Sequence, residues 1–367
     1  MPWTSNTATL PSVLTHHTNK IERVMKKYLP LLAAVLLGLA VCPWLVGCSQ
    51  PSATDEAAPA EQAPAASAFP RAAEGEFSVM TFNLNQYALV SRDGDPDTLE
   101  PKPREEAAAI IEAIRQAAPD VLAVQEMGDP AAWAEFKYSL RNAGLDYGHD
   151  EYLRRGKHEL NIAVLSRFPI VEKNSHTDDT YTIGPAQFPV LRGFIDIVIE
   201  VNPGYRFQLI VAHLKSKVFH SFGQAEMRRN EARLLGNHVR AALKANASVN
   251  LLVVGDFNDE PASAPLREIK TYKRQALLHD LRPTAPGGEA WTRRLGEDIY
   301  HRVDYMLVSD GMLPEVVLDK TYVMCMPELL RASDHRPLVM TFVAREMSPE
   351  AAPDLSTRTP PEILDND

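Results

Sequence analysis

Eight short apolar runs bounded by polar turns constrain the fold of this chain most strongly. They lie at residues 76–84, 120–127, 160–170, 192–201, 206–214, 250–258, 301–309 and 337–343. Several are hydrophobic almost throughout, which is typical of strands buried on both faces of a sheet. Residues 103–117 and 224–244 instead have the apolar periodicity of amphipathic helices. The pattern predicts one layered α/β domain over residues 76–343.

The N-terminal region predicts export. Residues 25–50, MKKYLPLLAAVLLGLAVCPWLVGCSQ, contain two lysines, an apolar run and small residues before a cysteine, which is the layout of a signal peptide. Residues 45–48, LVGC, resemble the lipobox of bacterial lipoproteins, so we expect a signal peptide at 25–47 and acylation of Cys48. A transmembrane anchor is the alternative, but the run from Leu31 is short and is broken by Pro43. Residues 1–24 do not resemble a signal region, and we expect Met25 to begin the native product.

The segments on either side of the domain have compositions that do not favour folding. Residues 48–75 are mostly Ala, Pro, Ser and acids and predict a tether, and residues 344–367 predict a disordered tail. With Cys42 removed and Cys48 acylated, only Cys325 would remain, so no intrachain disulfide is expected. Cys325 lies in the apolar run YVMCMP and is expected to pack in the core. We expect an extracytoplasmic monomer, anchored to a bacterial membrane through Cys48, with no protein partner implied.

The charge of the chain argues against a strongly basic surface for nucleic acid. The formal net charge is −10, although a local cationic groove remains compatible with it. Two basic stretches could contact phosphates or could simply be solvated. They are Arg154, Arg155, Lys157 and His158 in one loop, and Lys215, Lys217, Arg228 and Arg229 after His213.

Polar residues interrupt the apolar runs near their ends. They are Asn83, Glu126, His213, Asp256, Asn258, Asp304, Asp334 and His335. Strand ends are where ligands collect in layered α/β domains, because the sheet fixes the side chains while the loops leave them accessible. Carboxylate and amide oxygens suit hard divalent cations, and the two histidines can transfer protons. No zinc motif, nucleophile elbow or phosphate-binding glycine loop is present in the sequence.

Six segments resemble the ordered motifs of the endonuclease/exonuclease/phosphatase superfamily. They read TFNLNQY, VLAVQEM, VAHLKS, VVGDFND, HRVDYMLVS and ASDHRP, and they span most of residues 77–343. The resemblance implies a four-layered α/β sandwich, in which two packed mixed β-sheets are flanked by helices. It also implies a metal-dependent phosphoric ester hydrolase that uses Mg²⁺ or Mn²⁺.

The same resemblance assigns roles around the metal and the catalytic histidine. Glu126 matches the principal metal ligand, and Asn83 and Asp334 match residues that contribute to metal or phosphate positioning. His335 matches the catalytic histidine, and Asp304 matches the acid that orients it. This arrangement implies that the neighbours Asp334 and His335 serve the metal and the attacking water respectively.

The resemblance also assigns residues beside the attacked phosphate. Asp256 and Asn258 match the pair next to the phosphorus, and His213 matches a second phosphate-facing imidazole. Lys215 and Arg302 lie two residues from His213 and Asp304, so they are candidates for phosphate positioning. Whether His335 or Asp256 is the general base, and whether one or two metals bind, stays open at this point.

The departures from the family pattern narrow the expected activity. Apurinic endonucleases carry an acid where this chain has Asn85 and a tyrosine where it has His213, so abasic-site cleavage is not expected. Glu159 is a candidate partner for His213 or a surface acid. We expect an exported nuclease that hydrolyses phosphodiesters by metal-assisted water attack. The alternatives are a phosphomonoesterase, a sphingomyelinase-type lipid phosphodiesterase and, last, a non-catalytic binding lipoprotein.

Overall fold

Two six-stranded β-sheets form the framework of the computed structural model, which describes residues 69–155 and 160–355. The strand order of the first sheet is β17-β18-β1-β2-β4-β3, and that of the second is β13-β16-β10-β9-β8-β5. Both are mixed, because β1 and β2 run parallel, as do β9 and β10, while the other pairs are antiparallel. The first sheet contains β1 (Glu76–Tyr87), β2 (Val121–Met127), β3 (His149–Leu153), β4 (Asn161–Ser166), β17 (Val316–Val323) and β18 (Leu338–Val343). The second contains β5 (Ile170–Lys173), β8 (Phe194–Asn202), β9 (Tyr205–His213), β10 (Leu251–Asp256), β13 (His279–Asp280) and β16 (Asp304–Val308).

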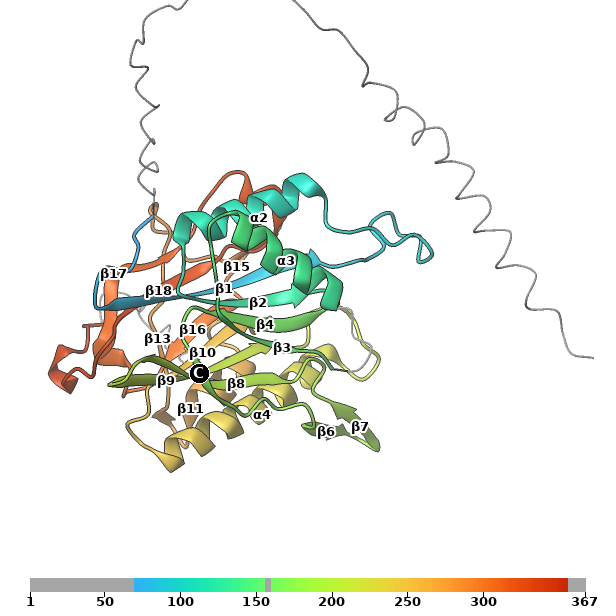
Figure 1. The fold of residues 1–367 in the computed structure, drawn as a ribbon. Coiled ribbons are helices and arrows are strands. Elements are labelled where there is room, and N and C mark those ends of the chain that lie inside the picture. The colour runs from blue at the N-terminus through green and yellow to red at the C-terminus, as the bar shows by residue number, and fades with distance from the viewer. Residues whose placement is uncertain (1–68, 156–159, 356–367) are drawn as a thin grey trace, which may run out of the picture. The chain divides into compact units, whose positions relative to one another are not determined.

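Helices cover the outer faces of the two sheets (Figure 1). The first sheet is covered by α2 (Arg104–Ala117), α3 (Pro130–Asn142) and the short α6 (Leu329–Ala332), and the second by α4 (Gln224–Ala245) and α5 (Ala264–Lys270). Three separate hairpins are β6 (Thr180–Ile183) with β7 (Ala186–Pro189), β11 (Thr271–Tyr272) with β12 (Gln275–Ala276), and β14 (Arg293–Gly296) with β15 (Ile299–His301). Two 3₁₀ turns, η1 (Leu313–Glu315) and η2 (Pro349–Ala351), flank β17 and β18.

The hydrophobic core is divided into three layers by the sheets. Between the sheets, Phe77 lies against Phe207 and Phe342 with ring centroids 5.1 and 5.2 Å away. Ile114 of α2 belongs to the layer outside the first sheet, and Leu235 of α4 belongs to the layer outside the second. This arrangement of helix, sheet, sheet and helix confirms the four-layered α/β sandwich predicted from the sequence.

Helix α3 was not predicted, although its N-terminus carries a clear local signal. Asp129 is the N-cap, and its side chain accepts hydrogen bonds from the N–H groups of the second and third following residues, while Pro130 occupies the first turn. Its buried side chains are Trp133, Phe136 and Leu140. They are spaced by three and four residues, so one face of the helix packs against the first sheet.

Described residues on both sides of 76–343 also contact the domain. The Phe69 ring stacks on Tyr322 with centroids 5.7 Å apart, and the Met347 N–H donates to Glu315 at 3.0 Å. Ala352 packs against the layer between the sheets. The predicted signal peptide, Cys48, residues 48–68 of the predicted tether and residues 356–367 of the predicted tail lie outside the described residues.

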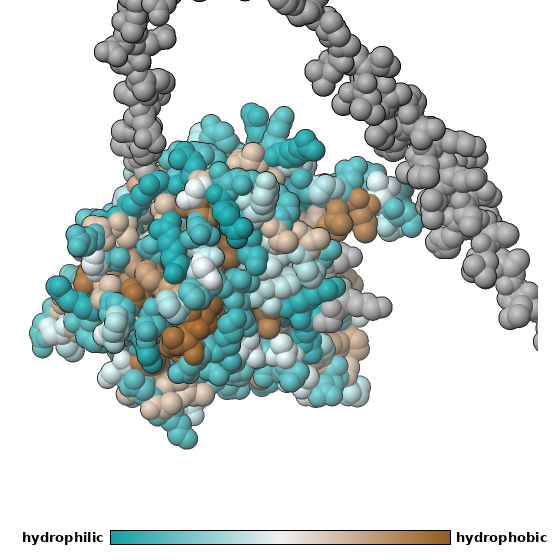
Figure 2. Space-filling view, in the orientation of Figure 1, coloured by the Kyte–Doolittle hydropathy of each residue, from teal (hydrophilic) through white to brown (hydrophobic). Residues whose placement is uncertain are grey.

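Three further observations concern the surface. In the part of the chain that the structure describes, no helix is long and apolar enough to cross a bilayer. The face shown in Figure 2 is mostly hydrophilic, with an apolar group on the projecting loop between β1 and α2, where Leu89 and Leu99 are exposed. The expectation that Cys325 packs in the core is wrong: β17 ends at Val323, and the cysteine that follows is exposed.

Candidate active site

The polar strand ends from both sheets meet in one cluster. In the second sheet, Asp256 is the last residue of β10, and it lies in register between His213 of β9 and Asp304 of β16. Asn83 of β1 joins this sheet to the first, since its Nδ2 donates to Asp256 at 3.1 Å and to Glu126 of β2 at 3.4 Å. The strand-end cluster consists of Asn83, Glu126, His213, Asp256, Asn258, Asp304, Asp334 and His335.

The backbone around Glu126 is held in a conformation that places its carboxylate at the end of the sheet. Glu126 has a φ of 61°, and Gln86 opposite has a φ of 59°. Both lie in the left-handed region, which is costly for residues with a Cβ and is frequent at functional sites. The Gln86 N–H donates to Glu126 Oε2 at 2.8 Å. An irregularity in the pairing of β1 and β2 therefore directs this carboxylate into the cluster.

A glycine allows the strands beneath the cluster to pair closely. Gly255 precedes Asp256 and has a φ of 134°, and a Cβ built on it would lie 1.9 Å from the Ala212 carbonyl oxygen. No residue with a side chain fits there without displacing β9. The close pairing brings His213 beside Asp256, with 3.5 Å between His213 Nε2 and Asp256 Oδ2.

Asp256 is buried and accepts several hydrogen bonds. Its Oδ1 accepts from the Asn258 backbone N–H at 2.8 Å, and its Oδ2 accepts from the Asn258 side chain at 3.2 Å and from Asn83. Burial raises the pKa of Asp256 to about 7, against the opposing charge of His335. The carboxyl group is thus fixed in place by its hydrogen bonds, and its burial favours the protonated form.

His335 and Asp304 form a buried pair from segments that are distant in sequence. His335 Nδ1 lies 2.8 Å from Asp304 Oδ2, so His335 Nε2 is left to face the cluster, 3.7 Å from Asp256 and 3.8 Å from Asp334. Burial lowers the pKa of His335, but the carboxylates of Asp304 and Asp256 outweigh it and raise the pKa to about 9. The loop is fixed by Ser333, which accepts from the His335 N–H at 3.0 Å and donates to the Asn83 carbonyl at 2.8 Å.

His213 is in a different electrostatic environment from His335. Burial and then the charge of Arg192 lower its pKa well below the usual value, so this imidazole is neutral at pH 7. Its Nδ1 has no hydrogen-bond partner among residues 69–155 and 160–355. Glu159, the candidate partner, lies outside the described residues. The two histidines therefore differ in charge, and His213 is suited to donating a hydrogen bond to phosphate from a neutral ring.

The donor atoms of the cluster fit a hard divalent cation. Glu126, Asn83 and Asp334 offer oxygen ligands from three separate segments, and carboxylate and amide oxygens suit Mg²⁺ or Mn²⁺. A second set, Asp256, Asp304 and His335, has donor atoms within 4.8 Å of one another. In that set His335 and Asp304 already bind each other. Glu126 is therefore the better candidate for the principal ligand.

Arg192 is a site residue that the sequence interpretation missed. It precedes β8 and is 9% exposed; its Nη1 donates to the His213 carbonyl at 3.4 Å, and its Nε has no partner among the residues described. The carboxylates that act on it electrostatically include Glu126 and Asp256 of the cluster and the buried Glu231. Burial lowers its pKa, yet an arginine stays charged, so Arg192 supplies positive charge beside the site.

Lys215 and Arg302 differ in how they relate to the cluster. Lys215 lies in the loop after His213, where its Nζ contacts the Ser216 hydroxyl and the Val218 carbonyl, and Arg192 is among the charges that lower its pKa after burial. Arg302 instead pairs with Asp280, and its guanidinium lies 4.8 Å from the ring centroid of Tyr305. The structure therefore does not bring Arg302 to the phosphate position, because Asp280 on the neighbouring edge strand binds it.

Most of the other basic side chains considered for phosphate contact are engaged elsewhere. Arg155 donates to the carbonyl groups of Thr177 and Val190, and Arg228 binds Asp259 at 2.8 Å. Arg229 pairs with Glu268 on α5. Lys157 and His158 lie outside the described residues.

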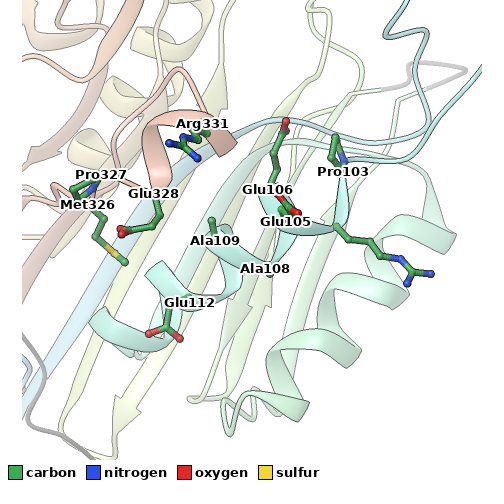
Figure 3. A pocket seen from close by; sticks show the side chains of 11 residues that line it. Pro103, Glu105, Glu106, Ala108, Ala109, Glu112, Met326, Pro327, Glu328 and Arg331 are labelled. Carbon is green, nitrogen blue, oxygen red and sulfur yellow. The ribbon is translucent and has the colours of Figure 1, made fainter.

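One cavity of about 1100 Å³ lies away from this chemistry. It is formed between α2 and α6 (Figure 3) and is lined by Pro103, Arg104, Glu105, Glu106, Ala108, Ala109, Glu112, Met326, Pro327, Glu328 and Arg331. No residue of the strand-end cluster lines it. Its four glutamates would repel a phosphate, so it is not the candidate active site.

Comparison with known proteins identifies the family. Residues 80–335 match the model of the Endonuclease/Exonuclease/phosphatase family, and the chain belongs to this family. It is therefore a phosphoric ester hydrolase of a metal-dependent class, as the sequence predicted. No curated protein matches the chain.

Three solved structures share the fold at low sequence identity. The human Nocturnin catalytic domain with bound sulfate is 20% identical, with a TM-score of 0.54 over 73% of this chain and 94% of that one. Sphingomyelinase C from Streptomyces griseocarneus is 18% identical, with a TM-score of 0.50 over 73% and 99%. An endonuclease/exonuclease/phosphatase from Beutenbergia cavernae is 20% identical, with a TM-score of 0.53 over 74% and 72%.

Proposed function

We propose that the chain is an exported, membrane-anchored phosphodiesterase that acts on nucleic acid. The observation that carries the proposal is the buried His335–Asp304 pair, whose free Nε2 faces Asp256 and Asp334. Hydrolysis of a phosphodiester requires proton transfer from water and stabilisation of charge on the phosphate oxygens. The cluster contains side chains suited to both tasks, which supports the proposal.

The side chains divide these tasks by position. Asp304 fixes the orientation of His335, which leaves Nε2 toward the reacting atoms. Asp256 and His335 lie 3.7 Å apart and can pass a proton between water and the site. Asn258 and His213 are uncharged donors beside Asp256, and they would bind the non-bridging phosphate oxygens.

A divalent cation would be held by Glu126 with Asn83 and Asp334. When bound, it would neutralise charge on the phosphate and lower the pKa of a coordinated water. Asn83 contacts both Glu126 and Asp256, so it would fix the metal side of the site relative to the phosphate side. Arg293 bonds Asp334 at 2.9 Å and orients its second oxygen toward the cluster.

The substrate class has two candidates. The proposal of nucleic acid rests on the arginine and lysine side chains near the cluster, Arg192, Lys215 and Arg293. A lipid phosphodiester of the sphingomyelinase type is the second candidate, and the apolar side chains near the site, such as Val218 and Phe219, favour it.

A substrate panel tests the proposal. The purified protein is assayed with Mg²⁺ on plasmid DNA, RNA, bis(p-nitrophenyl) phosphate, p-nitrophenyl phosphate and sphingomyelin micelles. We expect hydrolysis of the nucleic acids and the synthetic diester, with little on the monoester, and loss of turnover on chelation. Hydrolysis of the monoester alone, or activity that survives chelation, would refute the proposed function.

A further inference from the structure

Two segments beside the cluster interleave basic and aromatic residues. The β9–α4 loop reads KSKVFHSF at residues 215–222, and the β14–β15 hairpin with its flanks reads WTRRLGEDIYHR at residues 291–302. Both segments leave aromatic rings exposed beside basic side chains. The proposed hydrolysis uses none of these rings.

In the β9–α4 loop, the exposed rings are Phe219 and Phe222. Phe219 is 82% exposed, and Phe222 is 44% exposed. Phe222 packs against Phe188 of β7 with ring centroids 4.9 Å apart, and His220 lies 6.0 Å from both rings. These contacts fix Phe222 in place, so its exposed part forms an ordered apolar surface.

In the hairpin, Tyr300 and Trp291 form a second aromatic surface. Their ring centroids lie 4.6 Å apart, and the guanidinium of Arg336 lies 3.3 Å from the Trp291 ring centroid. Tyr300 is 46% exposed. Arg293 and Arg294 lie between the two aromatic residues in sequence, and both are half-buried.

Both segments are attached to the cluster and to each other. The loop begins two residues after His213, and the hairpin is bonded to Asp334 through Arg293 at 2.9 Å. Glu260 connects them, because its Oε1 lies 3.8 Å from Lys217 Nζ and 2.5 Å from His301 Nδ1. Both segments are therefore anchored beside the strand-end cluster.

We propose that these two segments bind single-stranded nucleic acid, with unpaired bases stacking on Phe219, Phe222 and Tyr300. Basic side chains would contact the backbone phosphates between the stacked bases. In a duplex the bases are already stacked on one another, so their faces are not available to these rings, and single strands should be preferred. The inference rests on the proposed nucleic acid substrate and adds that this substrate is single-stranded.

The composition of the hairpin tip favours this partner over a bilayer. Glu297 and Asp298 are exposed between Leu295 and Ile299, so inserting these apolar residues into lipid would bring two carboxylates with them. Burying charge in hydrocarbon is costly, whereas both acids could stay hydrated beside a nucleic acid. The test must therefore distinguish binding to nucleic acid from binding to lipid.

The experiment measures binding without turnover. The full protein in EDTA is titrated against fluorescent oligothymidylate, oligouridylate and a DNA duplex of equal length, with fluorescence anisotropy as the readout. We expect both single strands to bind more tightly than the duplex. Phe219→Ala, Phe222→Ala and Tyr300→Ala should each weaken single-strand binding about 5-fold or more, in line with base stacking on one ring. Tyr138→Ala is the matched control, since Tyr138 is an exposed aromatic residue on α3.

Parallel measurements separate this inference from the proposed function. Hydrolysis of bis(p-nitrophenyl) phosphate should be unchanged in the three variants, because none of the three rings belongs to the strand-end cluster. Equal affinity for duplex and single strand, or single-strand binding that the substitutions leave unchanged, would overturn the inference while leaving the hydrolase intact. Binding to phosphatidylglycerol vesicles that the same substitutions abolish, with oligonucleotide binding unaffected, would overturn it in favour of a bilayer.

Discussion

Glu315 carries a buried carboxyl group whose replacement should change how stability depends on pH. The residue is 0% exposed, and its Oε1 accepts the Met347 N–H at 3.0 Å. Its Oε2 has no partner within the described parts of the chain. Burial raises the pKa of Glu315 from 4.5 to about 7, and the nearby Glu346 adds to the increase. The folded state therefore favours the protonated carboxyl.

The sign and size of the effect follow from this pKa. Because the folded-state pKa lies above the unfolded value, the folded protein binds the proton more tightly. The stabilisation is complete below pH 4.5 and is lost as the pH rises through about 7. Each pKa unit corresponds to about 1.4 kcal/mol, so full ionisation costs on the order of 3 kcal/mol of unfolding free energy.

Glu315→Gln removes the ionisation and keeps the acceptor for Met347. Urea unfolding of both proteins between pH 4.5 and 8 measures the difference, in which the contributions of other titrating groups cancel. The variant should match the wild type near pH 4.5 and exceed it above pH 7 by on the order of 3 kcal/mol. Parallel stability curves across this range would show that the folded state does not raise the pKa of Glu315.

Three further predictions concern the site and the N-terminus. Glu126→Gln should raise the Mg²⁺ concentration needed for half-maximal turnover with little loss of thermal stability; an unchanged metal requirement would place the metal on another ligand. Arg192→Gln should raise KM for a phosphodiester and lower kcat, since its charge adjoins the site, and unchanged kinetics would assign it a structural role. Mass spectrometry of the membrane fraction should find diacylglyceryl-modified Cys48, and a mature peptide from residues 1–47 would contradict this.

The sequence predicted the parts of the fold that have strong local patterns. The eight apolar runs correspond to β1, β2, β4, β8, β9, β10, β16 and β18, and both predicted helices are present. The edge strand β17 was missed because Asp319 and Lys320 interrupt its apolar residues. Edge strands tolerate such charges, so hydrophobic pattern alone does not identify them.

The site was predictable where residues lie at strand ends. Asp256, His213 and Asp304 meet because their strands are neighbours in one sheet, and their places in the sequence indicated this. Arg192 could not be recognised in the same way. An arginine before a glycine is typical of a solvated turn, whereas Arg192 is buried, and carboxylates such as Glu231 come near it only in the folded chain. Arg302 was assigned by spacing alone, which does not reveal that Asp280 binds it.

The central claim is that His335 and Asp304 act as one catalytic unit, and a double-mutant cycle tests it most directly. His335→Ala and Asp304→Ala should each reduce kcat on bis(p-nitrophenyl) phosphate by about 10² or more, as expected for loss of proton transfer. The double variant should be little worse than the poorer single variant, because residues of one unit are strongly non-additive. Losses that simply multiply would contradict the account, because they would show that His335 acts independently of Asp304.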